Sequence, residues 1–189
     1  MRRIEVNGGR ITLPPFPPRW PQPIVYNFGD HLLSCTQLDD GFIIELNVVS
    51  WPGVFTRKLS YEGGQVIWEL ITPTRSELLV SEDDRTLTTK AGFHARFDAP
   101  LLFARSLSSG IAVLLRPTDA IGARNLFYYD LQGNCKWRVG PWPRFQHFFI
   151  QDANQVDDGN LRAVLQHGGQ ALIVDSATGS VLQQIDWKA

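Results

Sequence analysis

The sequence predicts an all-β fold built from repeated four-stranded units, and three observations lead to this prediction. Short runs of β-branched and aromatic residues alternate with Gly, Asp and Asn turns along the chain, as strands joined by tight turns do. Nowhere do the apolar residues follow the 3.6-residue period of a capped helix. A glycine-containing turn recurs at regular spacing, which is typical of repeat proteins.

Length and composition set limits on the kind of protein. The 189 residues, 43% of them hydrophobic, are enough for one domain over residues 1–189 with a core of its own. The 18 basic and 19 acidic residues give a net charge of −1, which argues against nucleic-acid binding. We find neither an apolar run that could span a membrane nor the apolar region of a signal peptide. With the two cysteines, Cys35 and Cys135, expected as free thiols, these features predict a cytoplasmic protein.

The N-terminal region begins with a hairpin over residues 3–13. Its turn, Asn7-Gly8-Gly9, supplies the positive φ angles that tight hairpin turns need. Residues 14–23 contain six prolines, which fix φ and remove backbone donors, so we expect an extended linker there. Residues 1–23 are thus a hairpin and a linker within the single domain.

Two kinds of turn recur in the rest of the chain. The first has an apolar residue, two small polar residues and a glycine before the next strand, at residues 37–41, 106–110 and 155–159. The second is a glycine turn between two strands, and the following strand has Trp or Gln four residues after the glycine. The glycines of the two turns are separated by 23, 23 and 20 residues, from Gly41 to Gly64, Gly110 to Gly133 and Gly159 to Gly179.

Each repeat therefore holds four strands in about 40–45 residues, the size and order of one blade of a β-propeller. The rhythm of strand, glycine turn and Trp resembles the repeats of the quinoprotein-like and WD-repeat β-propeller superfamilies over roughly residues 31–70, 101–140 and 146–187. The chain lacks the Gly-His and Trp-Asp dipeptides of WD repeats. The resemblance implies an architecture of propeller-like four-stranded antiparallel sheets and brings no activity or cofactor with it.

Three clear units leave two extra hairpins, at residues 3–13 and within residues 71–100. They are compatible with a small four-bladed ring, with a blade completed by the N terminus, or with an open partial propeller. An open propeller exposes sheet edges, which a partner or a second copy of the chain can cover, so a homodimer is one expectation.

The search for reactive groups yields no catalytic, cofactor-binding or metal-ligating residue. The chain has no nucleophile elbow, phosphate-binding loop or zinc-protease motif. Its four histidines are scattered and its cysteines form no C-x-x-C pair. We therefore expect no cofactor and no metal.

The repeat predicts a binding surface instead, on the face formed by the long loops within and between units. These loops are rich in Trp and Arg, the residues typical of binding hot spots. We take as candidate partner-binding residues Trp51, Arg116, Asp119, Arg124, Trp142, Arg144 and His167. The two tryptophans could instead cover the end of the core. The opposite face carries short turns with aspartate pairs, such as Asp39 and Asp40.

These observations favour a non-enzymatic module that binds another protein, in the manner of a bacterial immunity or antitoxin protein that inhibits a toxin. An acidic or aromatic patch complementary to a basic toxin would be its distinguishing feature. One alternative is a small-ligand or carbohydrate-binding module with Trp51 and Trp142 as stacking platforms. The other is a glycosidase or lyase, for which only Asp119 and His167 stand on the loop face.

Overall fold

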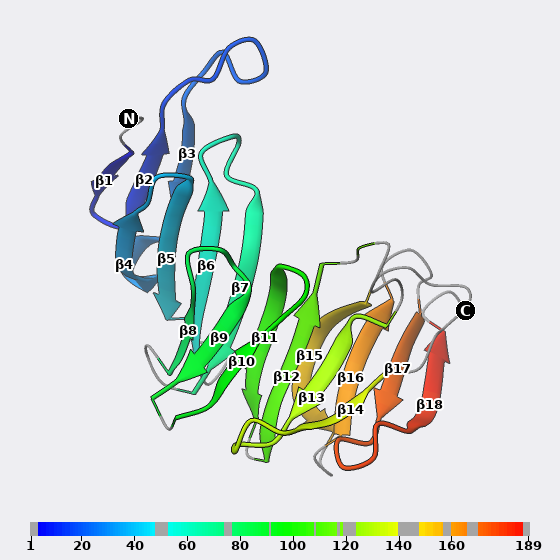
Figure 1. The fold of residues 1–189 in the computed structure, drawn as a ribbon. Helices are drawn as coiled ribbons and strands as arrows, with labels where there is room; N and C mark the ends of the chain where they lie inside the picture. Colours follow the sequence, from blue (N-terminus) through cyan, green and yellow to red (C-terminus); the bar gives the residue numbers. More distant parts are fainter. Residues whose placement is uncertain are drawn as a thin grey trace. The chain divides into compact units, whose positions relative to one another are not determined.

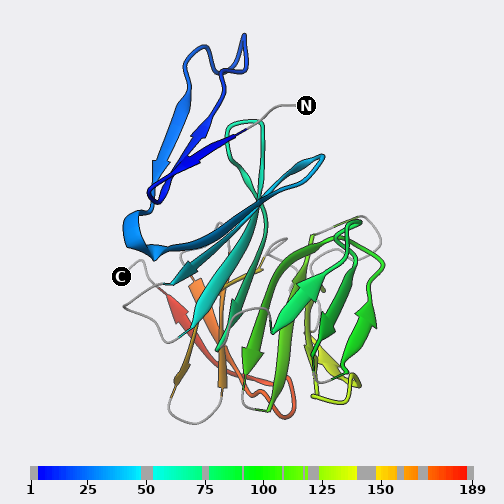
Figure 2. The same ribbon diagram turned by 90° about the vertical axis from the view of Figure 1, so that its left-hand side faces the viewer.

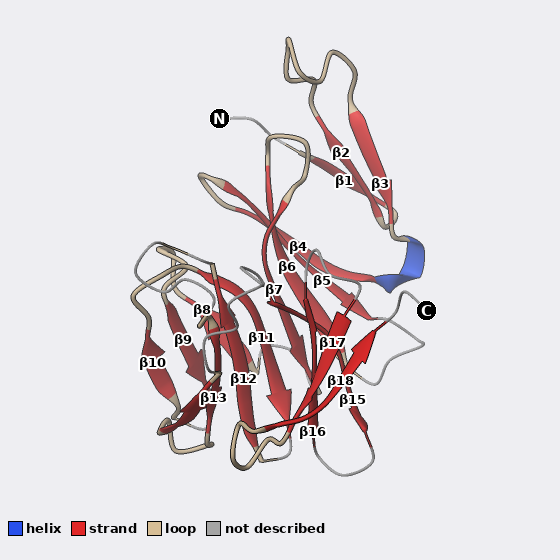
Figure 3. Cartoon of the chain, turned by 90° about the vertical axis from the view of Figure 1, so that its right-hand side faces the viewer, coloured by secondary structure: helices blue, strands red, loops and turns tan. Residues whose placement is uncertain are grey.

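The computed structural model describes residues 4–47, 53–73, 77–90, 92–107, 109–116, 118, 124–139, 148–156, 160–165 and 170–186. The only helix among these residues is one turn of 3-10 helix at Gly29–His31, drawn in blue in Figure 3. The all-β prediction is therefore confirmed. The chain divides into two compact units, Met1–Glu77 and Leu78–Ala189, which we describe in turn.

The first unit contributes three strands that form one antiparallel sheet and four antiparallel strands of a second sheet. The strands of the first sheet follow the order β1-β2-β3, and those of the second follow the chain order from β4 to β7. Their bounds are β1 (Glu5–Asn7), β2 (Arg10–Leu13), β3 (Ile24–Asn27), β4 (Leu32–Gln37), β5 (Gly41–Asn47), β6 (Val54–Ser60) and β7 (Val66–Thr72).

The predicted first hairpin is present, with Asn7 opposite Arg10 and the turn at the two glycines. Both glycines have positive φ, 55° at Gly8 and 75° at Gly9. A Cβ atom at Gly9 would lie 2.0 Å from the carbonyl oxygen of Gly29, so only glycine fits there. The N terminus, however, makes more than a hairpin, because β3 adds a third strand to it.

The proline-rich segment connects β2 to β3 and forms a loop that extends beyond the ends of both strands (Figure 2). The amide of Phe16 donates to the carbonyl of Trp20 at 2.6 Å, and the amide of Trp20 donates back at 2.7 Å. These two bonds close a tight turn over residues 17–19. The expectation of a continuously extended linker is therefore wrong for this stretch.

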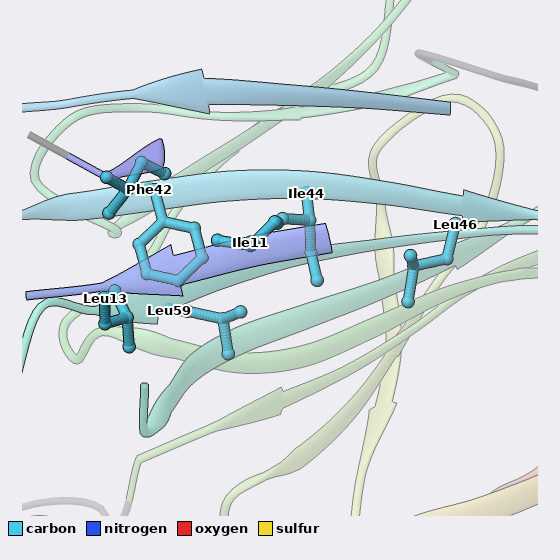
Figure 4. Close-up of a cluster of buried hydrophobic side chains, with 7 residues drawn as sticks. Ile11, Leu13, Phe42, Ile44, Leu46 and Leu59 are labelled. Carbon is cyan, nitrogen blue, oxygen red and sulfur yellow. The ribbon is translucent and has the colours of Figure 1, made fainter. Parts of the chain in front are cut away.

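A hydrophobic core lies between the two sheets of the first unit (Figure 4). Ile11 and Leu13 alternate with exposed or half-buried residues along β2, so both point to the same face of that sheet. Phe42, Ile44 and Leu46 are alternate residues of β5 and face them, and Glu45 between them is buried as well. Period-2 alternation thus buries one face of each sheet against the other.

The second unit contains strands of three antiparallel sheets, coloured from green to red in Figure 1. The first of them has three strands, in the order β10-β9-β8, where the sequence predicts a hairpin. This unit also contributes four strands, β11–β14, that pair in chain order within one sheet, and four more, β15–β18, that form the last sheet. Their bounds are β8 (Leu78–Val80), β9 (Thr86–Thr89), β10 (His94–Arg96), β11 (Leu101–Leu107), β12 (Gly110–Leu115), β13 (Leu126–Tyr129), β14 (Cys135–Arg138), β15 (Phe148–Val156), β16 (Asn160–Leu165), β17 (Gln170–Val174) and β18 (Val181–Asp186).

The strands of the three predicted repeats are thus present as β4–β7, β11–β14 and β15–β18, and the four strands of each repeat pair antiparallel in chain order. Within the second unit, an aromatic ring of β14 packs on the glycine turn of the last sheet. Trp137 of β14 lies on the turn between β17 and β18, where its indole Nε1–H donates to the carbonyl of Ser176 at 2.7 Å. Trp137 also stacks on Tyr128, with ring centroids 5.4 Å apart. Trp137 is therefore a packing residue between repeats.

Candidate functional site

The first unit contains an open cleft of about 510 Å³, within the usual size range of ligand sites. Three segments form it: the proline-rich loop, the turn between β4 and β5, and the turn between β6 and β7. We call it the acidic–aromatic cleft, because its lining combines three carboxylates with two aromatic rings. The lining residues are Phe16, Asp39, Asp40, Ser60, Tyr61, Glu62 and Gln65.

The turn between β4 and β5 supplies two of the carboxylates, Asp39 and Asp40. It is closed by a hydrogen bond from the amide of Leu38 to the carbonyl of Gly41, at 2.8 Å. A Cβ atom at Gly41 would lie 2.3 Å from the carbonyl oxygen of Leu59, so the glycine lets β5 approach β6 closely. The Asp-Asp-Gly sequence thus fixes the turn and leaves both carboxylates at the cleft.

The turn between β6 and β7 supplies the third carboxylate, Glu62. The amide of Ser60 donates to the carbonyl of Gln65 at 2.9 Å, and the Ser60 hydroxyl accepts from the Gln65 amide at 3.2 Å. The same hydroxyl donates to the carbonyl of Glu62 at 3.0 Å. These bonds within the turn fix the backbone that carries the Glu62 side chain, which is exposed.

Tyr61 joins the two turns. Its hydroxyl donates to the carbonyl of Leu38 at 2.7 Å, and its ring lies 6.0 Å from the ring of Phe42 in the core. Burial raises the pKa of the Tyr61 phenol, while the bond to Leu38 acts in the opposite direction. Tyr61 is therefore a neutral, oriented aromatic wall at neutral pH.

Phe16 is the second aromatic wall, and the proline-rich loop holds it in place. Its backbone is paired with that of Trp20. The indole ring of Trp20 covers the turn between β6 and β7, because a Cβ atom built at Gly63 would lie 2.9 Å from that ring. The Tyr26 hydroxyl also donates to the carbonyl of Gly63, at 3.1 Å. The loop is thus anchored on the β6–β7 turn beside the cleft.

The charges of the cleft are unequally compensated. The ammonium of Lys58, whose side chain is 2% exposed, lies 2.8 Å from a carboxylate oxygen of Asp40. The side-chain carboxylates of Asp39 and Glu62 have no hydrogen-bond or ion-pair partner among the residues that the structure describes. Three carboxylates and one ammonium leave a formal charge of −2 at the cleft.

Of the candidate partner-binding residues, only two lie within the described part of the chain. Arg116 directly follows β12 and Arg124 lies two residues before β13, so both are at one end of this hairpin. Arg116 is half-buried, with its amide bonded to the carbonyl of Pro100, whereas Arg124 is exposed. The remaining candidates lie outside the described residues: Trp51, Asp119, Trp142, Arg144 and His167.

The cleft is formed by the short turns of the first repeat and the proline-rich loop, and not by loops that carry candidate binding residues. Asp39 and Asp40 stand out in the sequence as an aspartate pair, but Phe16, Tyr61 and Glu62 do not. The repeat itself contained a usable signal, because the two turns of one blade lie at the same end of its sheet. That rule places Tyr61-Glu62 beside Asp39-Asp40.

The described residues include no group of three His, Cys, Asp or Glu side chains that could hold a metal ion. Nor does any helix in this part of the chain have the length and hydropathy needed to cross a membrane. Cys35 and Cys135 are free thiols, and burial raises the pKa of each. The cleft offers carboxylate acceptors, the carboxamide of Gln65 and aromatic surface.

Comparison with known proteins identifies no family for this chain. No family model matches it, and no curated protein does. Solved structures that are similar include BamB from Moraxella catarrhalis (13% identity, 98% of this chain, 46% of that chain, TM-score 0.33). A second is the dihydro-heme d1 dehydrogenase NirN, with 12% identity over 94% of this chain and 42% of that chain and a TM-score of 0.43. A third is apo AztD from Citrobacter koseri, with 11% identity over 99% of this chain and 60% of that chain and a TM-score of 0.40.

These three proteins have propeller-like folds. This chain spans 46%, 42% and 60% of their lengths, less than two thirds of each. Their identities and TM-scores are low, so they assign no function to this chain. The propeller-like assignment of its repeats rests on the strand order of its own sheets.

Proposed function

We propose that the protein is a non-enzymatic module that binds another protein through the acidic–aromatic cleft. The observation that supports this proposal is the composition of the cleft: two unpaired carboxylates, Asp39 and Glu62, beside the oriented rings of Phe16 and Tyr61. Aromatic residues are enriched in protein interfaces, and charged groups on one side select a partner of opposite charge.

The finer form of the proposal is an inhibitor of the immunity or antitoxin type, acting in the cytoplasm. The acidic and aromatic character of the cleft is what such a protein would present to a basic toxin. The two free thiols, Cys35 and Cys135, favour a reducing compartment.

The test is capture of a partner by the tagged protein from its native extract, followed by reconstitution of the purified pair. Three double variants would be compared with the wild type. Asp39→Asn/Glu62→Gln removes the unpaired charges of the cleft, and Trp51→Ala/Trp142→Ala alters the predicted loop surface. Glu5→Gln/Asp30→Asn removes two exposed charges elsewhere in the first unit and is the matched control.

We expect a one-to-one complex that the cleft variant weakens at least tenfold and the control leaves intact. If the partner is a nuclease or another toxin, its inhibition in an activity assay would establish the finer form. Loss of binding only in the loop variant would reject the cleft as the binding surface. A protein that captures no partner would contradict the proposal as a whole.

A second candidate, a carbohydrate-binding module, is favoured by one feature of the same cleft. An aromatic ring beside carboxylates, in about 510 Å³ of open volume, also suits the apolar face and hydroxyls of a sugar. A glycan array with the wild type and the Asp39→Asn/Glu62→Gln variant distinguishes the two. Glycan binding that the variant abolishes would favour this second candidate.

A further inference from the structure

We propose that the acidic–aromatic cleft binds the guanidinium group of an arginine that the partner protein presents on an exposed basic segment. This inference rests on the proposed function and deepens it by naming the chemistry of the partner. It follows from which polar groups of the cleft are free, from the shape of its walls and from its charge.

The charged groups that remain free in the cleft are acceptors, and the Gln65 carboxamide, which also lines it, both donates and accepts. The hydroxyls of Ser60 and Tyr61 already donate to backbone carbonyls, of Glu62 and Leu38 respectively. The carboxylates of Asp39 and Glu62 have no partner in the described part of the chain. An ionised carboxylate only accepts hydrogen bonds. The complementary group is therefore a cation with several N–H donors.

The buried Lys58 sets how many carboxylates are available. Its ammonium, 2.8 Å from Asp40, compensates that carboxylate from within the protein. Asp39 and Glu62 come from different turns, so an incoming cation would be held between two segments. A planar group with donors along several edges can reach both, whereas an ammonium is a compact point charge.

The aromatic walls favour arginine over lysine. A guanidinium stacks on aromatic faces and is more weakly hydrated than an ammonium, so it loses less on entering such a cleft. The Tyr61 ring is held by its bond to Leu38, and the backbone of Phe16 by its two bonds to Trp20. Walls that are already oriented do not need to be ordered on binding.

A divalent metal ion is the competing cation, and the structure gives it less support. Such an ion takes six or more oxygen ligands at short range, and the described residues include no group of three carboxylate, histidine or cysteine side chains that could hold one. The aromatic rings would contribute nothing to a metal site. The cleft therefore matches an organic cation better than an inorganic one.

The test is an NMR titration of the full-length, ¹⁵N-labelled protein with three blocked pentapeptides. All have two glycines on each side of a central residue, which is arginine, lysine or citrulline. Citrulline has the shape of arginine without its charge. We expect saturable shifts of the amides at residues 39–41 and 60–65 with the arginine peptide. The affinity should be at least fivefold lower with lysine, and no saturation should occur with citrulline.

Variants then connect the binding to the proposed groups. Asp39→Asn/Glu62→Gln should lower the arginine affinity at least tenfold, whereas Glu5→Gln/Asp30→Asn should leave it unchanged. Phe16→Ala should reduce the preference for arginine over lysine, because it removes one stacking surface. The peptide series on the wild-type protein tests the inference even if a variant fails to fold.

The outcomes separate this inference from the proposed function. Equal affinity for arginine and lysine, binding of citrulline, or shifts outside the cleft would overturn the arginine site. If partner capture still depended on Asp39 and Glu62, the proposed function would stand without it. If the arginine peptide bound as expected but no protein partner were captured, the site would stand and the proposed function would fall.

Discussion

Single glycines determine where aromatic side chains pack in this fold. In the first unit the ring of Trp20 covers Gly63, and in the second the ring of Trp137 covers Gly179. Both glycines have a φ of 72°, in the left-handed region. Glycine at these positions serves two purposes: it permits the turn, and it leaves room for the ring.

Replacing Gly179 with alanine tests both purposes. The new Cβ atom would lie 2.6 Å from the Trp137 ring, so the ring must move. Gly92, with φ 97° and no atom within 4 Å of a built Cβ, is the matched control. We expect Gly92→Ala to cost about 1–2 kcal/mol for the backbone alone. Gly179→Ala should cost about 1–3 kcal/mol more from overpacking. Urea denaturation measures both, and equal losses would contradict the packing role of Trp137.

At the scale of elements, one turn design recurs between the strands of four hairpins. A polar residue at its start donates its amide across the turn and accepts a turn amide on its side-chain oxygen. Asp130 and Asp175 do this in the last two repeats, and Ser60 and Ser81 do it in the other two hairpins. The aspartates are recognisable in the sequence, but the serine versions are not, because serine is common in loops of every kind.

The turn at Asp130 should make stability depend on pH. The pKa of its carboxyl is lowered to about 2, first by the side-chain amide of Asn134 and then by the Asn134 backbone amide and Lys136. An unfolded aspartate titrates near about 3.9, so the folded state binds the proton more weakly. The stabilisation is therefore complete above about pH 4 and is lost as the pH falls toward about 2.

Urea midpoints between about pH 7 and about pH 2 would show this effect. Asp130→Asn should be less stable than the wild type at neutral pH, and the difference should narrow in acid. Asn134→Ala keeps the carboxylate but removes its strongest donor. The stability difference between this variant and the wild type should also narrow in acid. Parallel pH curves for the wild type and Asp130→Asn would show that the turn does not stabilise the charged form.

Across the whole molecule, the sequence predicts repeats better than it predicts what lies between them. The three four-stranded units were predicted because each carries two glycine turns separated by 20 or 23 residues. The third strands of the two smaller sheets were missed. Residues 24–27 follow a proline run, and residues 94–96 are too few to show alternation. The acidic–aromatic cleft combines two turns with a loop that is distant in the sequence. The local residue pattern does not predict where that loop folds back.

The charge of the whole molecule leads to a last prediction, on salt. A net charge of −1 is too small to steer a partner over long distances, so any electrostatic attraction must come from local groups such as Asp39 and Glu62. Salt screens such groups, because the Debye length falls from about 10 Å at 0.1 M to about 3 Å at 1 M. We expect the association rate with the captured partner, measured by surface plasmon resonance, to fall steeply with added salt.

The Asp39→Asn/Glu62→Gln variant should flatten this salt dependence. Glu5→Gln/Asp30→Asn changes the net charge equally and should leave it steep. If both double variants changed the slope equally, overall charge rather than the cleft would guide association.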